Sequence, residues 1–142
     1  MMTRGYSLEQ DLRLLINNPK YSDIEILCKD EKTLYGSRVI LAARSDVFEG
    51  LLYNNGMRTY ENKISFSGIN SSGMIIILEY IYTGSVEGPL TKDNIFEAFH
   101  AADYFQLSKL KDYIIKTAKN ILEDEEDQEL LSKAVDAMHI GR

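Results

Sequence analysis

Residues 39–48 read Val39-Ile40-Leu41-Ala42-Ala43-Arg44-Ser45-Asp46-Val47-Phe48, a short apolar run that passes directly into a helix-capping pair. We expect residues 39–43 to be buried, because the run is apolar throughout. Ser45 has the side chain of a helix N-cap, and the apolar residues between 47 and 52 then repeat on one helix face. Asn54-Asn55-Gly56 ends that helix. The stretch therefore predicts two short consecutive helices.

Short β-type segments lie on both sides of this pair of helices. Residues 23–28 are β-rich and partly alternating, residues 29–32 form a polar turn, and residues 33–35 return as the second arm of a hairpin. Downstream, residues 63–66 alternate between polar and apolar side chains, which is typical of a further strand. The sheet that these segments predict is small.

Four helices are predicted after the last strand. They run from Ser71-Ser72 to Gly84, from Thr91 past Ala102, from Ser108 to Leu122, and from Leu130 to Met138. The first is apolar around nearly its whole circumference, which is typical of a central, buried helix. The acidic run at residues 123–129 is the only candidate boundary. Strands segregated from helices in this way predict an α+β fold.

A leading helix precedes the hairpin, over residues 8–16. Ser7 at the cap and Gln10 three residues later have the form of a capping box. The apolar stripe of this helix consists of Leu8, Leu12, Leu15 and Ile16. A helix of this length does not persist alone in water, so the stripe must dock on another surface. That surface is either the rest of the same domain or a second copy of the chain.

Composition excludes several classes of function. The chain has 142 residues and a formal net charge of −6, from 16 basic and 22 acidic residues, which argues against nucleic acids and anionic membranes as partners. The longest apolar run, residues 74–81, is far shorter than the roughly 20 residues of a membrane span. One cysteine and two histidines cannot build a paired-cysteine zinc site. No phosphate loop or nucleophile elbow occurs, so we expect no cofactor and no catalysis. An intracellular protein, cytoplasmic or nuclear, is expected.

Four segments resemble the BTB/POZ domain family. They are Ser22-Asp23-Ile24, residues 39–45 followed by Phe48, Leu78 to Gly84, and Ala101 to Leu107. The resemblance implies a helical cluster capped by a small β-sheet, and a binding module without catalysis. It divides the chain into an N-terminal dimerisation helix at residues 1–20, a BTB/POZ core at 21–122, and an acidic linker with a C-terminal helix at 123–142, as the start of a following helical region.

The resemblance also implies a homodimer. In dimeric members a leading helix packs on a second copy, which assigns the stripe Leu8, Leu12, Leu15 and Ile16 to the dimer interface. Such members hold an acid and a base in a charged pocket near the dimer axis, at positions that match Asp23 and Arg38 here. The alternative is that these two are independent surface charges.

Many family members bridge a cullin to a substrate for ubiquitin transfer. By resemblance, the cullin-facing surface consists of Tyr53, Met57, Thr59, Tyr104 and Phe105. Cullin-binding members often carry an apolar-x-Glu motif, and here Met57 fills the apolar position while Thr59 stands in place of Glu. The alternative for Tyr104 and Phe105 is internal packing between helices. The leading hypothesis is a homodimeric adaptor for a cullin-type ubiquitin ligase; the other is a dimerisation scaffold for a transcriptional or cytoskeletal assembly.

Overall fold

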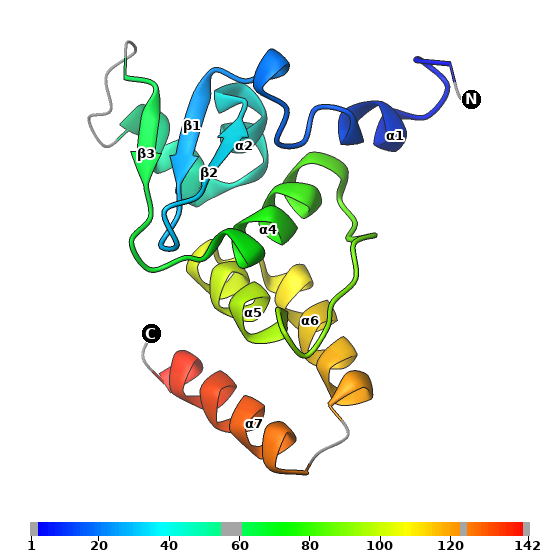
Figure 1. Cartoon of the computed structure of the whole chain (residues 1–142), viewed down its shortest axis with the longest axis vertical. Helices are drawn as coiled ribbons and strands as arrows, with labels where there is room; N and C mark the ends of the chain where they lie inside the picture. Colours follow the sequence, from blue (N-terminus) through cyan, green and yellow to red (C-terminus); the bar gives the residue numbers. More distant parts are fainter. Residues whose placement is uncertain (1–2, 55–60, 123–124, 141–142) are drawn as a thin grey trace.

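A computed structural model describes residues 3–54, 61–122 and 125–140. Its sheet has three strands in the order β2-β1-β3. The strand β1 (Ile24–Leu27) pairs antiparallel with β2 (Thr33–Gly36) and parallel with β3 (Lys63–Ser65). Figure 1 shows this sheet at one end of the molecule, with the helices α4, α5 and α6 on one side of it. The predicted hairpin and the predicted later strand are both confirmed.

The helix α2 (Arg38–Arg44) packs closely against the sheet. A Cβ atom added at Gly36 would lie 2.9 Å from Cδ1 of Leu41, so the absence of a side chain on β2 lets α2 approach. The expectation that residues 39–43 are buried is wrong for most of the run. Leu41 is fully buried, but Val39 is 68% exposed, because a helix turns only one side toward the core.

The next elements follow α2 without a break. The helix α3 (Asp46–Glu49) is continued by η2 (Gly50–Asn54), a π-helical turn. The backbone N–H of Phe48 donates to Oγ of Ser45 at 3.1 Å, so the predicted N-cap is confirmed. This cap fixes the start of α3 and directs Phe48 into the core.

The central helix is α4 (Ser71–Thr83), which packs against α1 (Leu8–Arg13), α2 and α5. Its buried side chains include Met74, Ile77 and Leu78, as expected for a helix that is apolar on nearly all sides. Gly84 ends it in the left-handed conformation, with φ of 82°, and donates its N–H to the Tyr80 carbonyl at 2.7 Å.

Three further helices follow in the described part of the chain: α5 (Ile95–Tyr104), α6 (Ser108–Ile121) and α7 (Glu125–Ile140). α5 begins later than predicted, because Thr91 and Asn94 form a turn in which the Thr91 N–H donates to Oδ1 of Asn94 at 2.8 Å. α7 lies at the end of the molecule away from the sheet (Figure 1), and Leu131 is its buried anchor. This architecture is the α+β arrangement that the sequence predicts.

Candidate interaction surfaces

The leading helix is shorter than predicted, and its stripe is divided. α1 covers Leu8–Arg13, and the chain then continues in tight turns, with the N–H of Leu15 donating to the Leu12 carbonyl at 3.0 Å. Leu15 and Ile16 pack against the core of their own domain, whereas Leu8 is 77% exposed. Leu12 is half-buried. The four residues therefore do not form one continuous exposed face.

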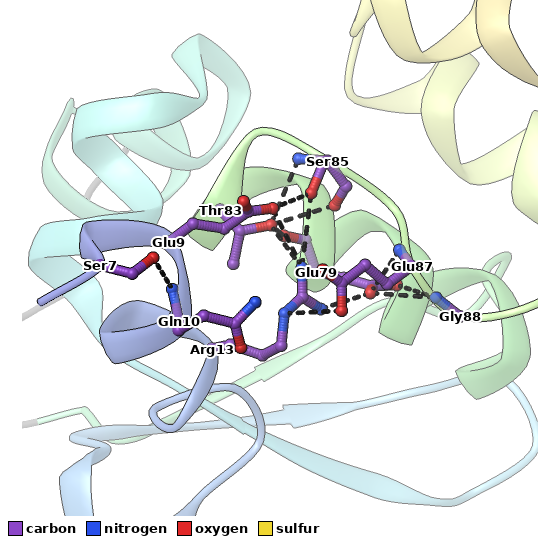
Figure 2. Close-up of polar contacts among 9 residues, drawn as sticks. All are labelled: Ser7, Glu9, Gln10, Arg13, Glu79, Thr83, Ser85, Glu87 and Gly88. Atoms are coloured by element: carbon purple, nitrogen blue, oxygen red, sulfur yellow. Dashed lines mark hydrogen bonds and ion pairs between the residues drawn. The ribbon is translucent and has the colours of Figure 1, made fainter. Parts of the chain in front are cut away.

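A polar cluster around Arg13 fixes α1 on its own domain (Figure 2). The Arg13 guanidinium lies 2.5 Å from Oε2 of Glu79 on α4, 3.5 Å from Oε1 of Glu9 on α1, and 3.4 Å from Oε2 of Glu87 in the loop after α4. Although burial opposes the charge, the Glu79 hydrogen bond and the neighbouring carboxylates raise the pKa of Arg13. One cation therefore holds three anions from three segments.

The same cluster orders the loop that follows α4. The carboxylate of Glu79 accepts the backbone N–H of Glu87 at 2.8 Å and that of Gly88 at 3.1 Å. The Ser85 hydroxyl donates to Glu9 and thereby joins the loop to α1. We refer to Glu9, Arg13, Glu79, Ser85 and Glu87 as the Arg13 cluster. From the sequence, Glu9 and Arg13 are recognisable as an (i, i+4) pair. Nothing local indicates Glu79, which is 66 residues away.

Asp23 and Arg38 contact each other, but not as an ion pair. Oδ1 of Asp23 accepts the backbone N–H of Arg38 at 2.8 Å, and the hydroxyl of Tyr82 accepts the N–H of Ser37 at 2.8 Å. Both N–H groups lie at the start of α2, where a helix leaves its first donors unsatisfied. Burial raises the pKa of Tyr82, which keeps the hydroxyl neutral. Asp23 therefore serves as a cap supplied from the start of the hairpin.

The Arg38 side chain is buried, yet its guanidinium has no hydrogen bond or ion pair with any described residue. An arginine in this position has five N–H donors to satisfy. Water or another molecule must supply the acceptors. The carboxylate of Asp23 is thus engaged by the backbone, while the guanidinium of Arg38 is not engaged by another described residue.

Phe105 does not belong to an exposed partner surface, and its assignment there was wrong. It is 2% exposed, and its ring stacks on that of Phe48 with centroids 4.7 Å apart and an interplanar angle of 15°. The Phe66 ring contacts both of these rings edge to face. The alternative of internal packing is therefore correct for Phe105, because this aromatic group fills the space between the sheet and the helices.

Tyr104 and Tyr53 remain on the surface, with exposed fractions of 44% and 50%. The Tyr104 ring rests edge to face on the Phe66 ring, at a centroid distance of 5.8 Å, and on the Phe105 ring at 5.0 Å. Tyr104 is thus both exposed and held in place by buried rings. Met57 and Thr59, the other two predicted surface residues, lie outside the described residues.

The described residues offer no candidate for metal or thiol chemistry. Within residues 3–54, 61–122 and 125–140, no three His, Cys, Asp or Glu side chains converge to hold a metal ion. Burial raises the pKa of the Cys28 thiol to about 11, so the thiolate that reacts is scarce at neutral pH. Among the described helices, none has both the length and the apolar character that crossing a membrane requires.

Comparison with known proteins agrees with this fold. The BTB/POZ domain family matches residues 12–136. Over 113 residues the chain is 27% identical to human BTB/POZ domain-containing protein 19, and this alignment covers 79% of this chain and 38% of that protein. Over 105 residues it is 31% identical to human Kelch-like protein 6, covering 74% of this chain and 16% of that protein. The chain therefore spans less than half the length of these relatives.

A solved structure shows the same architecture. The BTB (Tramtrack and Bric a brac) domain of human Gigaxonin superposes with a TM-score of 0.57 and 26% identity, covering 82% of this chain and 98% of that one. The resemblance carried by the four sequence segments is thus confirmed by a family match over most of the chain and by a structural match. This chain belongs to the BTB/POZ domain family.

Proposed function

We propose that this chain is a homodimeric adaptor that recruits a cullin-type ubiquitin ligase. A BTB domain is a protein-interaction module, and that coarser function follows from the family itself. The dimer and the cullin are the two parts of the proposal. Each part has its own structural support and its own experiment.

The observation that carries the dimer is the exposed apolar surface of the N-terminal part of the chain. Five large apolar side chains among the first 39 residues are exposed: Tyr6, Leu8, Leu14, Tyr21 and Val39. Of these, Leu14 and Tyr21 line one surface hollow together with Leu12 and Leu15, and contiguous exposed apolar surface is typical of an interaction site. A self-complementary surface closes as a two-fold dimer.

Arg38 gives the dimer a second line of support. Its guanidinium has no acceptor among the described residues, and its nitrogen atoms still reach water, since none of them is fully buried without a partner. An acceptor from a second copy would replace that water with a charge-assisted hydrogen bond and so stabilise the association. This retains the predicted charged pocket at the dimer axis, with Arg38 as the group that faces the partner and Asp23 as the group that fixes the helix start.

Light scattering across a concentration series tests the dimer. The wild type should give about twice 16.2 kDa at micromolar concentration. Leu8→Asp and Val39→Asp should give folded monomers, because both side chains are exposed and their own core does not need them. Leu130→Asp, an exposed leucine on α7, is the matched control and should remain dimeric. A wild-type monomer at every concentration would refute the dimer.

The cullin surface is supported by the two exposed tyrosines. Tyr104 is held by the buried rings of Phe66 and Phe105, so little side-chain freedom is lost when a partner covers it. Aromatic side chains with this combination of exposure and fixed position are typical binding anchors. Tyr53 and Met57, on either side of the end of η2 in the sequence, extend the proposed surface.

Calorimetric titration with a cullin N-terminal domain tests this part. Tyr104→Ala should weaken binding by at least about tenfold, equivalent to about 1.4 kcal/mol. Thr59→Glu should tighten it, because the new carboxylate adds a charge-assisted hydrogen bond of about 1.5–3 kcal/mol. Tyr113→Ala, an exposed tyrosine on α6, is the matched control. Binding that neither Tyr104→Ala nor Thr59→Glu changes would place the cullin elsewhere.

Thr59 favours the second candidate function, a dimerisation scaffold for a transcriptional or cytoskeletal assembly that does not bind a cullin. The sequence lacks Glu at the position where cullin-binding members often carry it. The scaffold would be favoured if the wild type is a dimer and if neither the wild type nor Thr59→Glu gives a heat of binding with any of a panel of cullin N-terminal domains.

A further inference from the structure

α1 has little apolar attachment of its own to hold it in place. The helix is six residues long and contains no buried residue. Isolated helices shorter than about 12–15 residues are marginal in water, so α1 depends on contacts made outside the helix. Leu15 and Ile16 provide some apolar contact, but they lie after the helix, in the turns that lead to the hairpin. The position of α1 itself is therefore set by polar contacts.

Those contacts converge on one side chain. Arg13 is the last residue of α1, and its guanidinium reaches Glu79 on α4, Glu87 in the following loop, and the Thr83 and Ser85 hydroxyls at 3.3 and 3.4 Å. Figure 2 shows these groups arranged around the guanidinium. Arg13 and Glu79 are mostly buried, so their interaction is screened less than that of a surface pair.

The charge balance makes Arg13 the critical member of the cluster. Glu9, Glu79 and Glu87 contribute three negative charges around one positive charge. Loss of one carboxylate leaves the cation with two partners. Loss of the cation leaves three carboxylates close together, and like charges at this separation repel each other. Neutralising Arg13 would therefore turn a contact that holds α1 on α4 into one that expels it.

We propose that Arg13 is the positioning residue that keeps α1 on its own chain, so that two copies associate through fixed surfaces and do not exchange their leading helices. This inference rests on the proposed homodimer. Exchange of an N-terminal element between copies is a low-cost route to a dimer when the element is weakly attached. The Arg13 cluster slows exchange, because α1 would have to leave all of these partners before it could make the same contacts on a second copy.

Chemical cross-linking distinguishes a dimer in which α1 packs on its own chain from one in which the two copies have exchanged α1. In Glu9→Cys/Ser85→Cys, which keeps the Arg13 contacts with Glu79 and Glu87, a short bismaleimide should join the two thiols, because the two positions face each other across α1 and the loop. Under dimeric conditions the product on a denaturing gel should have the mass of one chain. A product with the mass of two chains would show exchange and overturn the proposal. Each single cysteine variant controls for random coupling, and the buried Cys28 should not react.

Hydrogen exchange tests the role of Arg13 directly. Arg13→Gln should raise the exchange rate of amides in residues 8–16 by at least about tenfold and leave α4 and α5 unchanged. Arg13→Lys should retain part of the protection, because it keeps the charge. Lys109→Gln makes the same change of charge at an exposed site on α6 and should have no effect. Unchanged exchange in Arg13→Gln would overturn the proposal, whatever the mass of the wild type.

Measuring the mass in solution of the wild type and Arg13→Gln tests the attachment of α1 by Arg13 separately from the proposed homodimer. If the wild type is a dimer, Arg13→Gln should dissociate at concentrations at least about tenfold higher than the wild type does, or exchange its helices in the cross-linking assay. A monomeric wild type whose α1 is still released by Arg13→Gln would refute the dimer and leave the attachment of α1 by Arg13 standing.

Discussion

Gly73 of α4 lies directly against the main chain of α5 at Glu97. A Cβ atom placed on Gly73 would be 2.4 Å from the Glu97 carbonyl oxygen and 2.9 Å from its carbonyl carbon. The obstruction is backbone, which cannot rotate away as a side chain can. The close approach of the two helices therefore depends on the absence of a side chain at this position.

Gly73→Ala should lower the free energy of unfolding by about 2 kcal/mol. Overpacking typically costs about 1–3 kcal/mol, and the gain of about 1 kcal/mol from replacing glycine inside a helix offsets only part of a clash with backbone. Urea denaturation measures the change. Gly50→Ala is the matched control, since a Cβ atom there meets nothing within 4 Å and the backbone is already helical. Equal stability of Gly73→Ala and the wild type would mean that α4 and α5 lie farther apart.

Phe105→Ala should lower the stability of the fold much more than Tyr104→Ala, because Phe105 is a core residue and Tyr104 is a surface residue. Removing Phe105 should cost about 3–5 kcal/mol of stability, because its ring is enclosed by Phe48 and Phe66. Removing the half-exposed Tyr104 should cost about 1 kcal/mol, mainly from its edge-to-face contacts. Thermal unfolding of the two variants measures the difference. Similar losses would contradict the assignment of Phe105 to the core.

Asp23 and Arg38 should show little energetic coupling in the monomer. The Asp23 carboxylate bonds to the backbone N–H of Arg38, which Arg38→Gln retains, so the two substitutions should be additive to within about 0.5 kcal/mol. Asp23→Ala alone should cost about 0.5–2 kcal/mol, as for other lost helix caps. A double-mutant cycle on the Leu8→Asp background measures this. Coupling above about 1 kcal/mol would show that the two charges meet.

Cys28 should react with thiol reagents only after the protein opens. Burial raises the pKa of its thiol to about 11, so below that pH the folded protein holds it as the unreactive thiol. Labelling with an aromatic disulfide at pH 8 should be slow in the native state and fast in urea. Fast labelling without denaturant would contradict the buried position of this residue.

The sequence was sufficient for the elements that rest on local patterns. Alternation predicted the hairpin and β3, capping residues predicted the starts of α1 and α3, and the all-round apolar pattern identified α4 as the central helix. These features depend on residues within a few positions of each other. The family resemblance likewise rests on four short segments, each of which is a local pattern of neighbouring residues.

Only the tertiary structure decided which side chains remain available to a partner. Phe105 and Tyr104 are adjacent in the sequence, yet one is enclosed by Phe48 and Phe66 and the other is exposed. The apolar run at residues 39–43 lies in helix α2, which buries Leu41 and leaves Val39 exposed to solvent. Glu79 reaches Arg13 across 66 positions of sequence. Such outcomes depend on how distant segments come together, which periodicity and capping do not encode.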